Sequence, residues 1–289
     1  MEHPENHWST TRTAAGMHGL SAALWILSLV IFRVPLGQLV SLALQDDRYT
    51  YVLLVPVISG FLLWLKKEEL QESARYSPAV GIPVLIAGLG ISAVPATELG
   101  LTIFGILVVW LGIVLLSYGT RVVRSASFPF LFLLLLIPAP AGVMDRVVAV
   151  LQKASADTTA GLFRLIGIPF ERDGFEFALN GVNIEIAEEC SGVRSATAMF
   201  ISAILAGHLL LKSGWKQISF VLVTIPVVIF KNAVRITGIT WLGLNIDQGF
   251  FAGDLHRNSG IPFSLLAVAM LAPTLWALRR TERGPQSAH

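Results

Sequence analysis

The sequence predicts an all-α polytopic membrane protein with about eight transmembrane helices, an interfacial helix and a small β-hairpin. Of its 289 residues, 54% are hydrophobic and only 14% are charged, which is too little charge to solvate a soluble domain of this size. The apolar residues gather in stretches close to the roughly 20 residues that a helix needs to cross a bilayer. The basic residues are scattered among these stretches, so we expect a lipid bilayer and no nucleic acid as partner.

About eight apolar stretches qualify as spans or nearly do, and we expect one membrane domain over residues 1–289. Residues 1–16 and 279–289 form polar tails, and no cleavage pattern of small residues follows the first stretch. The fifth stretch is short and ends in prolines, so re-entry instead of crossing is the alternative for it, although this would make the basic 212–216 loop and the Arg279-Arg280 tail external. The stretches cover residues 17–39, 49–65, 78–95, 99–118, 123–141, 190–211, 217–243 and 260–278.

The loops between the stretches predict the orientation of the chain. Lysine and arginine collect on the cytoplasmic side of membrane proteins, and every even-numbered stretch is followed by a basic loop or tail. Both termini are therefore expected to be cytoplasmic, and the odd-numbered connections external. The basic residues that carry this argument are Lys66, Lys67, Arg75, Arg121, Arg124, Lys212, Lys216, Arg279, Arg280 and Arg283.

The external segment 142–189 is expected to hold two further elements. From about Val143 to Ile166, apolar residues recur among polar ones, which is typical of a helix lying in the interface. The expected apolar positions are Val147, Val148, Leu151, Leu162 and Leu165. After it, two alternating strands flank Asn180-Gly181, a dipeptide that accepts the positive φ angles of a tight turn. The apolar positions of this hairpin are Phe175, Phe177, Leu179, Val182, Ile184 and Ile186.

Three chemically useful side chains are predicted to lie at one height in the membrane. Counted from the cytoplasmic loop at Ser213, Cys190 lies about 23 residues up one helix and Arg235 about 22 residues up the next, or roughly 33 to 35 Å for both. His256 comes shortly before the last helix enters from the same side. The three groups are therefore expected to meet near the outer surface.

Cys190 is the only cysteine, which excludes a disulfide within the chain and any cysteine cluster for a metal. It begins a predicted helix, where unpaired amides and the helix dipole favour a thiolate, and Arg194 follows on the same face. The adjacent Glu188 and Glu189 act in the opposite direction unless they pair with arginines. A small, buried, apolar role is the alternative for a lone cysteine.

Lys231 and Arg235 interrupt an otherwise apolar helix, with Asn232 one turn before Arg235. Charges at such depth are costly and usually functional, so Arg235 is a candidate donor to a developing oxyanion. Snorkelling to the interface is the alternative, and it fits Lys231 better than Arg235. His256 suits a general acid and base, although its local sequence also fits a plain surface loop. No spacing typical of metal ligands occurs, so neither a metal nor another cofactor is expected.

At these residues the chain resembles the exosortase and archaeosortase family of membrane sorting enzymes. The family pattern appears as Glu188-Glu189-Cys190-Ser191-Gly192-Val193-Arg194, as Asn232-Ala233-Val234-Arg235-Ile236, and as His256 before the last helix. The Leu-Leu-Leu-Leu-Ile-Pro-Ala-Pro run and the hairpin are also similar, so the resemblance covers most of residues 125–275. The second span departs from the family, because Tyr49-Thr50-Tyr51 stands where members often have a Tyr-Ser-His-Gly-like segment.

The resemblance implies a cysteine transpeptidase in the bacterial inner membrane with its active site facing the periplasm. Its substrates would be membrane-anchored secreted proteins with a C-terminal sorting tail. Cys190, Arg235 and His256 would be catalytic, and Glu188, Ser191, Gly192, Arg194 and Asn232 would support them or bind substrate. Gly81, Gly88 and Gly90 in the third stretch are candidates for close packing against a substrate helix.

Three other functions stay open on the sequence alone. A small transporter or anion-binding channel would use Arg194, Lys231 and Arg235 inside the bundle, although the charges lie near one surface instead of the midplane. A structural partner in polysaccharide export would leave the thiol idle. An intramembrane protease would differ only in using water instead of an amine to release the product.

Overall fold

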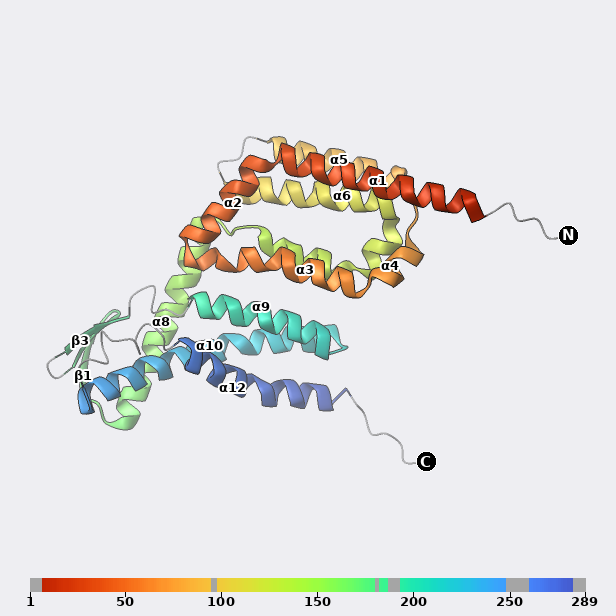
Figure 1. Cartoon of the computed structure of the whole chain (residues 1–289). Helices are drawn as coiled ribbons and strands as arrows, with labels where there is room; N and C mark the ends of the chain where they lie inside the picture. Colours follow the sequence, from red (N-terminus) through yellow and green to blue (C-terminus); the bar gives the residue numbers. More distant parts are fainter. Residues whose placement is uncertain (1–6, 95–97, 180–181, 187–192, 248–259, 283–289) are drawn as a thin grey trace, which may run out of the picture. The chain divides into compact units, whose positions relative to one another are not determined.

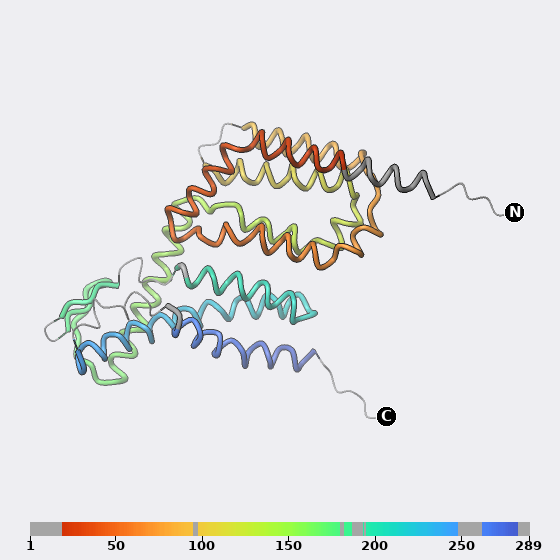
Figure 2. The backbone as a smooth tube through the Cα atoms, viewed as in Figure 1, coloured from red at the N-terminus to blue at the C-terminus, as the bar shows by residue number. Residues whose placement is uncertain are grey.

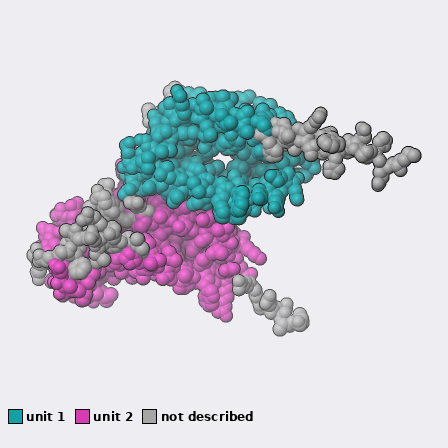
Figure 3. Space-filling model, viewed as in Figure 1, with its two compact units in different colours: residues 1–140 teal, residues 141–289 magenta. Residues whose placement is uncertain are grey.

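The computed structural model describes residues 7–94, 98–179, 182–186, 193–247 and 260–282, and leaves out the side chains of residues 7–18, Arg194, Gly260 and Ile261. The chain forms two compact units, Met1–Pro140 and Ala141–His289, coloured separately in Figure 3. The expected single domain, with its tails and external segment, stays a prediction.

Unit 1 is built from helices of very different lengths (Figure 1). Helix α6 packs against α5 and α1, whereas α3 packs against α7 and the 3₁₀ helices η1 and η2. Asp46 caps η1 by accepting a hydrogen bond from the Arg48 backbone N–H. The elements of unit 1 are α1 (His7–Ile31), α2 (Arg33–Gln45), η1 (Asp47–Leu53), α3 (Leu54–Leu65), α4 (Lys67–Ser73), α5 (Pro78–Ala93), α6 (Leu99–Ser125), α7 (Ser127–Phe132) and η2 (Leu133–Leu136).

Glycines bring α5 and α6 into close contact. A Cβ built on Gly81 would lie 2.4 Å from Leu116 Cα, and one on Gly88 would lie 2.5 Å from the Val109 backbone nitrogen. A side chain at either position would therefore collide with the backbone of α6. The expectation that Gly81 and Gly88 pack against a substrate helix is wrong, because the chain's own α6 fills that space. Gly90 faces open space.

The described helices include four that are long and apolar enough to cross a membrane, or up to seven if each of three broken pairs counts as one span. The chain is therefore a multi-pass membrane protein, and the number of eight spans stays a prediction. The first expected span, 17–39, is bent by 68° between Ile31 and Arg33. The four continuous spans are Asp47–Leu65, Leu99–Ser125, Gly214–Asn245 and Pro262–Arg280, and Ser195–Leu210 is a shorter apolar helix.

Unit 2 combines helices with a small sheet. Helices α9 and α10 turn back on each other around residues 211–213, and α12 packs against both (Figure 2). Helix α8 packs along α10. The elements are α8 (Ala141–Ile166), β1 (Phe170–Asp173), β2 (Glu176–Leu179), β3 (Val182–Glu185), α9 (Val193–Leu210), α10 (Gly214–Asn245) and α12 (Gly260–Arg280).

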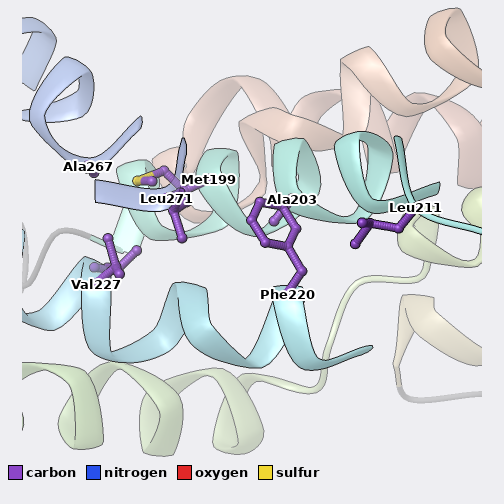
Figure 4. Packing of buried hydrophobic residues seen from close by; sticks show 8 residues of the cluster. Met199, Ala203, Leu211, Phe220, Val227, Ala267 and Leu271 are labelled. Carbon is purple, nitrogen blue, oxygen red and sulfur yellow. The ribbon is translucent and has the colours of Figure 1, made fainter. Parts of the chain in front are cut away.

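A hydrophobic core holds α9, α10 and α12 together. Met199 and Ala203 of α9 meet Val227 of α10 and Ala267 and Leu271 of α12, all of them buried (Figure 4). Phe220 and Leu211 extend the cluster towards the turn between α9 and α10. Because the cluster draws on all three helices, it holds them side by side beneath the polar residues of α10.

The predicted hairpin is confirmed, and the structure adds a third strand. Leu179 pairs with Val182 across Asn180-Gly181, as the alternation predicts. Strand β1 pairs antiparallel with β2, giving the sheet order β1-β2-β3. Gly174, with φ of 59°, lies in the β1–β2 turn. The sequence Asp173-Gly174 was a signal for this turn, and sequence reasoning did not use it.

Helix α8 is present over the expected residues, but its buried face differs from the expected apolar one. Ser155, Ala156, Thr159 and Ala160 are buried, together with Val148, Gln152 and Phe163. Val147 and Leu165, which the sequence places on the apolar face, are 46% and 79% exposed. Small residues allow α8 to approach the rest of the unit closely, so larger apolar residues are left on its outer side. The interfacial position stays a prediction.

Candidate functional site

An aromatic cluster fixes the sheet against α8. Phe163 of α8, Phe170 of β1 and Phe177 of β2 lie with ring centroids 5.5 to 5.6 Å apart. Arg172 lies over the Phe177 ring and also forms an ion pair of 2.9 Å with Asp157 of α8. Aromatic pairs of this kind stabilise beyond their buried area. The sheet is therefore a firm support for the chain that leaves it at Ile186.

Ile186 is held on both sides of its peptide unit. Its backbone N–H donates to the Phe175 carbonyl at 3.0 Å, and its own carbonyl accepts a hydrogen bond of 2.5 Å from Gln152 Nε2 of α8. Gln152 and Ile186 are both buried. A buried carbonyl that lost this donor would cost about 1–3 kcal/mol. Gln152 thus fixes the last described residue before the segment that contains Cys190.

Beyond that segment, the chain is held again by a lysine of α10. Lys231 Nζ donates to Ser195 Oγ at 2.6 Å, in the first turn of α9. Lys231 is only 1% exposed. The snorkelling alternative for Lys231 is therefore wrong, because its ammonium lies inside the unit instead of reaching the surface.

Asn232 points to a different helix from its neighbour Lys231. It is fully buried, and its Nδ2 donates to Ser155 Oγ of α8 at 3.2 Å. A buried polar pair of this kind fixes one helix against another, since its separation would leave two polar groups unsatisfied. Helix α10 is therefore joined by polar side chains to α8 on one face and to α9 on another.

Arg235 follows Lys231 by one helical turn, so the two lie on related faces of α10. Arg235 is half-buried. Close to it along the helix, a Cβ built on Gly238 would lie 3.9 Å from Phe263 Cζ of α12. The beginning of α12 thus reaches the height of Arg235 or beyond. Because His256 precedes α12 in the chain, this arrangement is compatible with the predicted height of the histidine.

Several predicted site residues lie outside the described part of the structure. Glu188, Cys190, Ser191, Gly192 and His256 belong to the residues that are left out, and the side chain of Arg194 does too. The structure therefore brings together Arg235, Asn232 and Lys231 on α10, and their grouping with the thiol and the imidazole stays a prediction. Gln152 and Ser155 were missed by sequence reasoning, because their partners lie 34 and 77 residues away.

Two carboxylates outside the spans have perturbed acidities. The side-chain hydrogen bond from Arg48 holds the pKa of Asp46 below its usual value. Hydrogen bonds from the Lys212 and Ser213 backbone N–H groups lower the pKa of Glu282. Glu282 thereby ties the end of α12 to the loop between α9 and α10. This contact anchors the end of unit 2 that the basic loops predict to be cytoplasmic.

Comparison with known proteins gives one family. A sequence model of the transmembrane exosortases matches residues 43–273. The matched region includes every residue of the predicted site, from Glu188 to His256, and parts of both units. No curated protein and no solved structure shows a significant match to the chain.

Proposed function

We propose, because the chain belongs to the transmembrane exosortase family, that it is a cysteine transpeptidase cleaving the C-terminal sorting signals of secreted proteins. The family is generally one of sorting-related transpeptidases, and its substrate here would be a membrane-anchored protein with a C-terminal sorting tail. The reaction would take place at the outer, periplasmic face of a bacterial inner membrane. Cys190, Arg235 and His256 would be the catalytic residues.

One observation carries this proposal, namely the contact between Lys231 and Ser195. These residues are 36 positions apart and lie equally far from Ser213 in the turn between α9 and α10. One helical turn further from Ser213 on each side come Arg235 and Ser191, the neighbour of Cys190. The contact supports an arrangement in which the Cys190 thiol and the Arg235 guanidinium lie at the same height in the membrane.

The proposed chemistry begins with the Cys190 thiolate attacking the carbonyl carbon of the scissile peptide. Arg235 donates to the oxyanion that forms, as a fixed cation can in a site with little water. The carbon–nitrogen bond then breaks, and the leaving amine takes a proton from the His256 imidazolium. A thioester remains on Cys190.

The second half of the reaction releases the product. An acceptor amine, or water, attacks the thioester carbonyl and gives its proton to the neutral His256 imidazole. The carbon–sulfur bond breaks, and the Cys190 thiolate is restored. With an amine the product is a transpeptidated protein, and with water it is a hydrolysed one.

The test is an acyl-enzyme trap. The chain is co-expressed with a substrate that carries a recognition motif, a transmembrane helix and a basic tail, and the reaction is quenched in acid so that a thioester is preserved. We expect a hydroxylamine-sensitive adduct on Cys190, which Cys190→Ser should abolish and which His256→Ala should reduce, because that variant lacks the acid for the leaving amine. Cys190→Ala alone should stop processing of the tail while leaving the protein in the membrane. Unchanged processing by Cys190→Ala would refute the proposal.

The alternative of an anion-binding channel receives less support. It would need Lys231 to face a path for ions, whereas Lys231 is 1% exposed and donates to Ser195 of α9. Ion flux through vesicles containing the purified protein, unchanged by Cys190→Ala, would favour the channel over the enzyme.

A further inference from the structure

The buried side chain of Lys231 on α10 donates a hydrogen bond to Ser195 of α9. We infer that Lys231 is a positioning residue of the transpeptidase site, which holds the first turn of α9 at a fixed height beside α10. This inference rests on the proposed function. In this role Lys231 does not contact the substrate. It holds the first turn of α9 at a fixed height relative to Arg235 on α10.

The burial of Lys231 argues against a role in stability alone. Its side chain is 1% exposed, and taking an ammonium out of water is energetically costly. Among the described residues, no Asp or Glu forms an ion pair with Lys231 that would offset this cost. An apolar residue of similar length would fill the same space without the cost. The cation is therefore best explained by the geometry that it imposes.

The contact is well placed to control geometry at the site. A hydrogen bond between charged and neutral groups is short and directional, and this one measures 2.6 Å. It joins the first turn of α9 to α10 one turn below Arg235. The apolar cluster beneath it, which includes Met199 and Val227, holds the helices together, but apolar packing is non-directional and specifies the register less sharply than a hydrogen bond does. Lys231 thus supplies the specific register that apolar packing leaves loose.

The experiment uses the full chain in detergent or vesicles with the co-expressed sorting tail as substrate. The variants are Lys231→Met, Ser195→Ala and the double variant. Ser202→Ala is the matched control, because Ser202 also lies on α9 but its hydroxyl donates to its own helix at Ala198. Membrane insertion, melting temperature, kcat and KM for tail cleavage, and alkylation of Cys190 by iodoacetamide are measured for each.

We expect Lys231→Met to lower kcat about tenfold or more, while KM changes less than about twofold. Its melting temperature should stay equal or rise, since an apolar residue replaces a buried charge. Ser195→Ala should also lower kcat, and the double variant should be no slower than Lys231→Met alone, because both changes remove the same hydrogen bond between Lys231 and Ser195. Alkylation of Cys190 should persist in all variants, and Ser202→Ala should behave as the unchanged chain.

Three results would overturn the inference: unchanged kcat in Lys231→Met, additive losses in the double variant, or a fall in melting temperature that parallels the fall in kcat. If Lys231→Met fails to insert, Ser195→Ala decides alone, and an unchanged kcat in that variant overturns the inference. Cys190→Ala, measured in parallel, separates a failure of the proposed function from a failure of the inference about Lys231. If Cys190→Ala still cleaves the tail, the proposed function fails, whereas its inactivity beside an active Lys231→Met refutes only the role of Lys231.

Discussion

Replacing Gln152 by Met tests how strongly the sheet fixes the chain before Cys190. The substitution keeps the length of the side chain and removes the hydrogen bond of 2.5 Å to the Ile186 carbonyl. That carbonyl belongs to a buried residue, so the expected loss is about 1–3 kcal/mol. If this whole free-energy loss affects the orientation of the segment that follows Ile186, the fraction of molecules with Cys190 in position for attack decreases by about 5- to 150-fold.

Gln217→Met is a matched control for this prediction. Gln217 Nε2 donates to the Leu211 carbonyl at 2.9 Å. This contact lies near the turn between α9 and α10, at the end of the two helices that is far from Arg235. Both variants remove one amide-to-carbonyl hydrogen bond, so both are expected to lower the melting temperature. Only Gln152→Met should lower the kcat of tail cleavage by the folded protein. Equal kcat values for the two variants, at equal amounts of folded protein, would show that the reasoning about Ile186 is wrong.

Two further predictions concern parts of the chain away from the site. Gly81→Val should destabilise the packing of α5 on α6 by about 1–3 kcal/mol or more, because its Cβ meets the α6 backbone. Gly90→Val is the control and should be tolerated, because nothing lies within 4 Å of a Cβ at that position. Equal melting temperatures of the two variants in detergent would contradict the close contact. The contact made by Glu282 stabilises the fold at neutral pH, since its folded pKa is lowered, and the contribution should be lost as the pH falls through that lowered pKa. The melting temperature, measured at several pH values from 7 to about 3, should fall less steeply with acid in Glu282→Gln than in the unchanged chain. The same pH dependence in both proteins would refute this role of Glu282.

Much of the fold follows from local patterns. The hairpin register around Asn180-Gly181 depends on alternation and one turn, and both are visible in the sequence. Strand β1 was missed because only Phe170 of its four residues is even partly buried, so its pairing depends on the aromatic cluster instead of on alternation. The bend after Ile31 interrupts an apolar run, and Pro35 in the first turn of α2 was the available signal.

The candidate site was predictable to a lesser degree, for a physical reason. Arg235 and Asn232 stand out because polar groups in an apolar helix are costly wherever they lie. Gln152 and Ser155 do not stand out, since polar residues are ordinary in an amphipathic helix such as α8. Their importance comes from partners on other elements, and a single sequence does not reveal which distant residues meet.

The polar contacts of unit 2 share one arrangement that bears on the proposed catalysis. Gln152 holds the chain at Ile186, and Lys231 holds it again at Ser195. Cys190 lies between these two points in sequence. A nucleophile in a membrane enzyme has to meet a peptide whose depth is set by its own helix, so an error of one turn, about 5.4 Å, would prevent attack. Fixing both ends of the segment to one rigid pair, α8 and α10, limits that error, because Asn232 and Ser155 join these two helices directly.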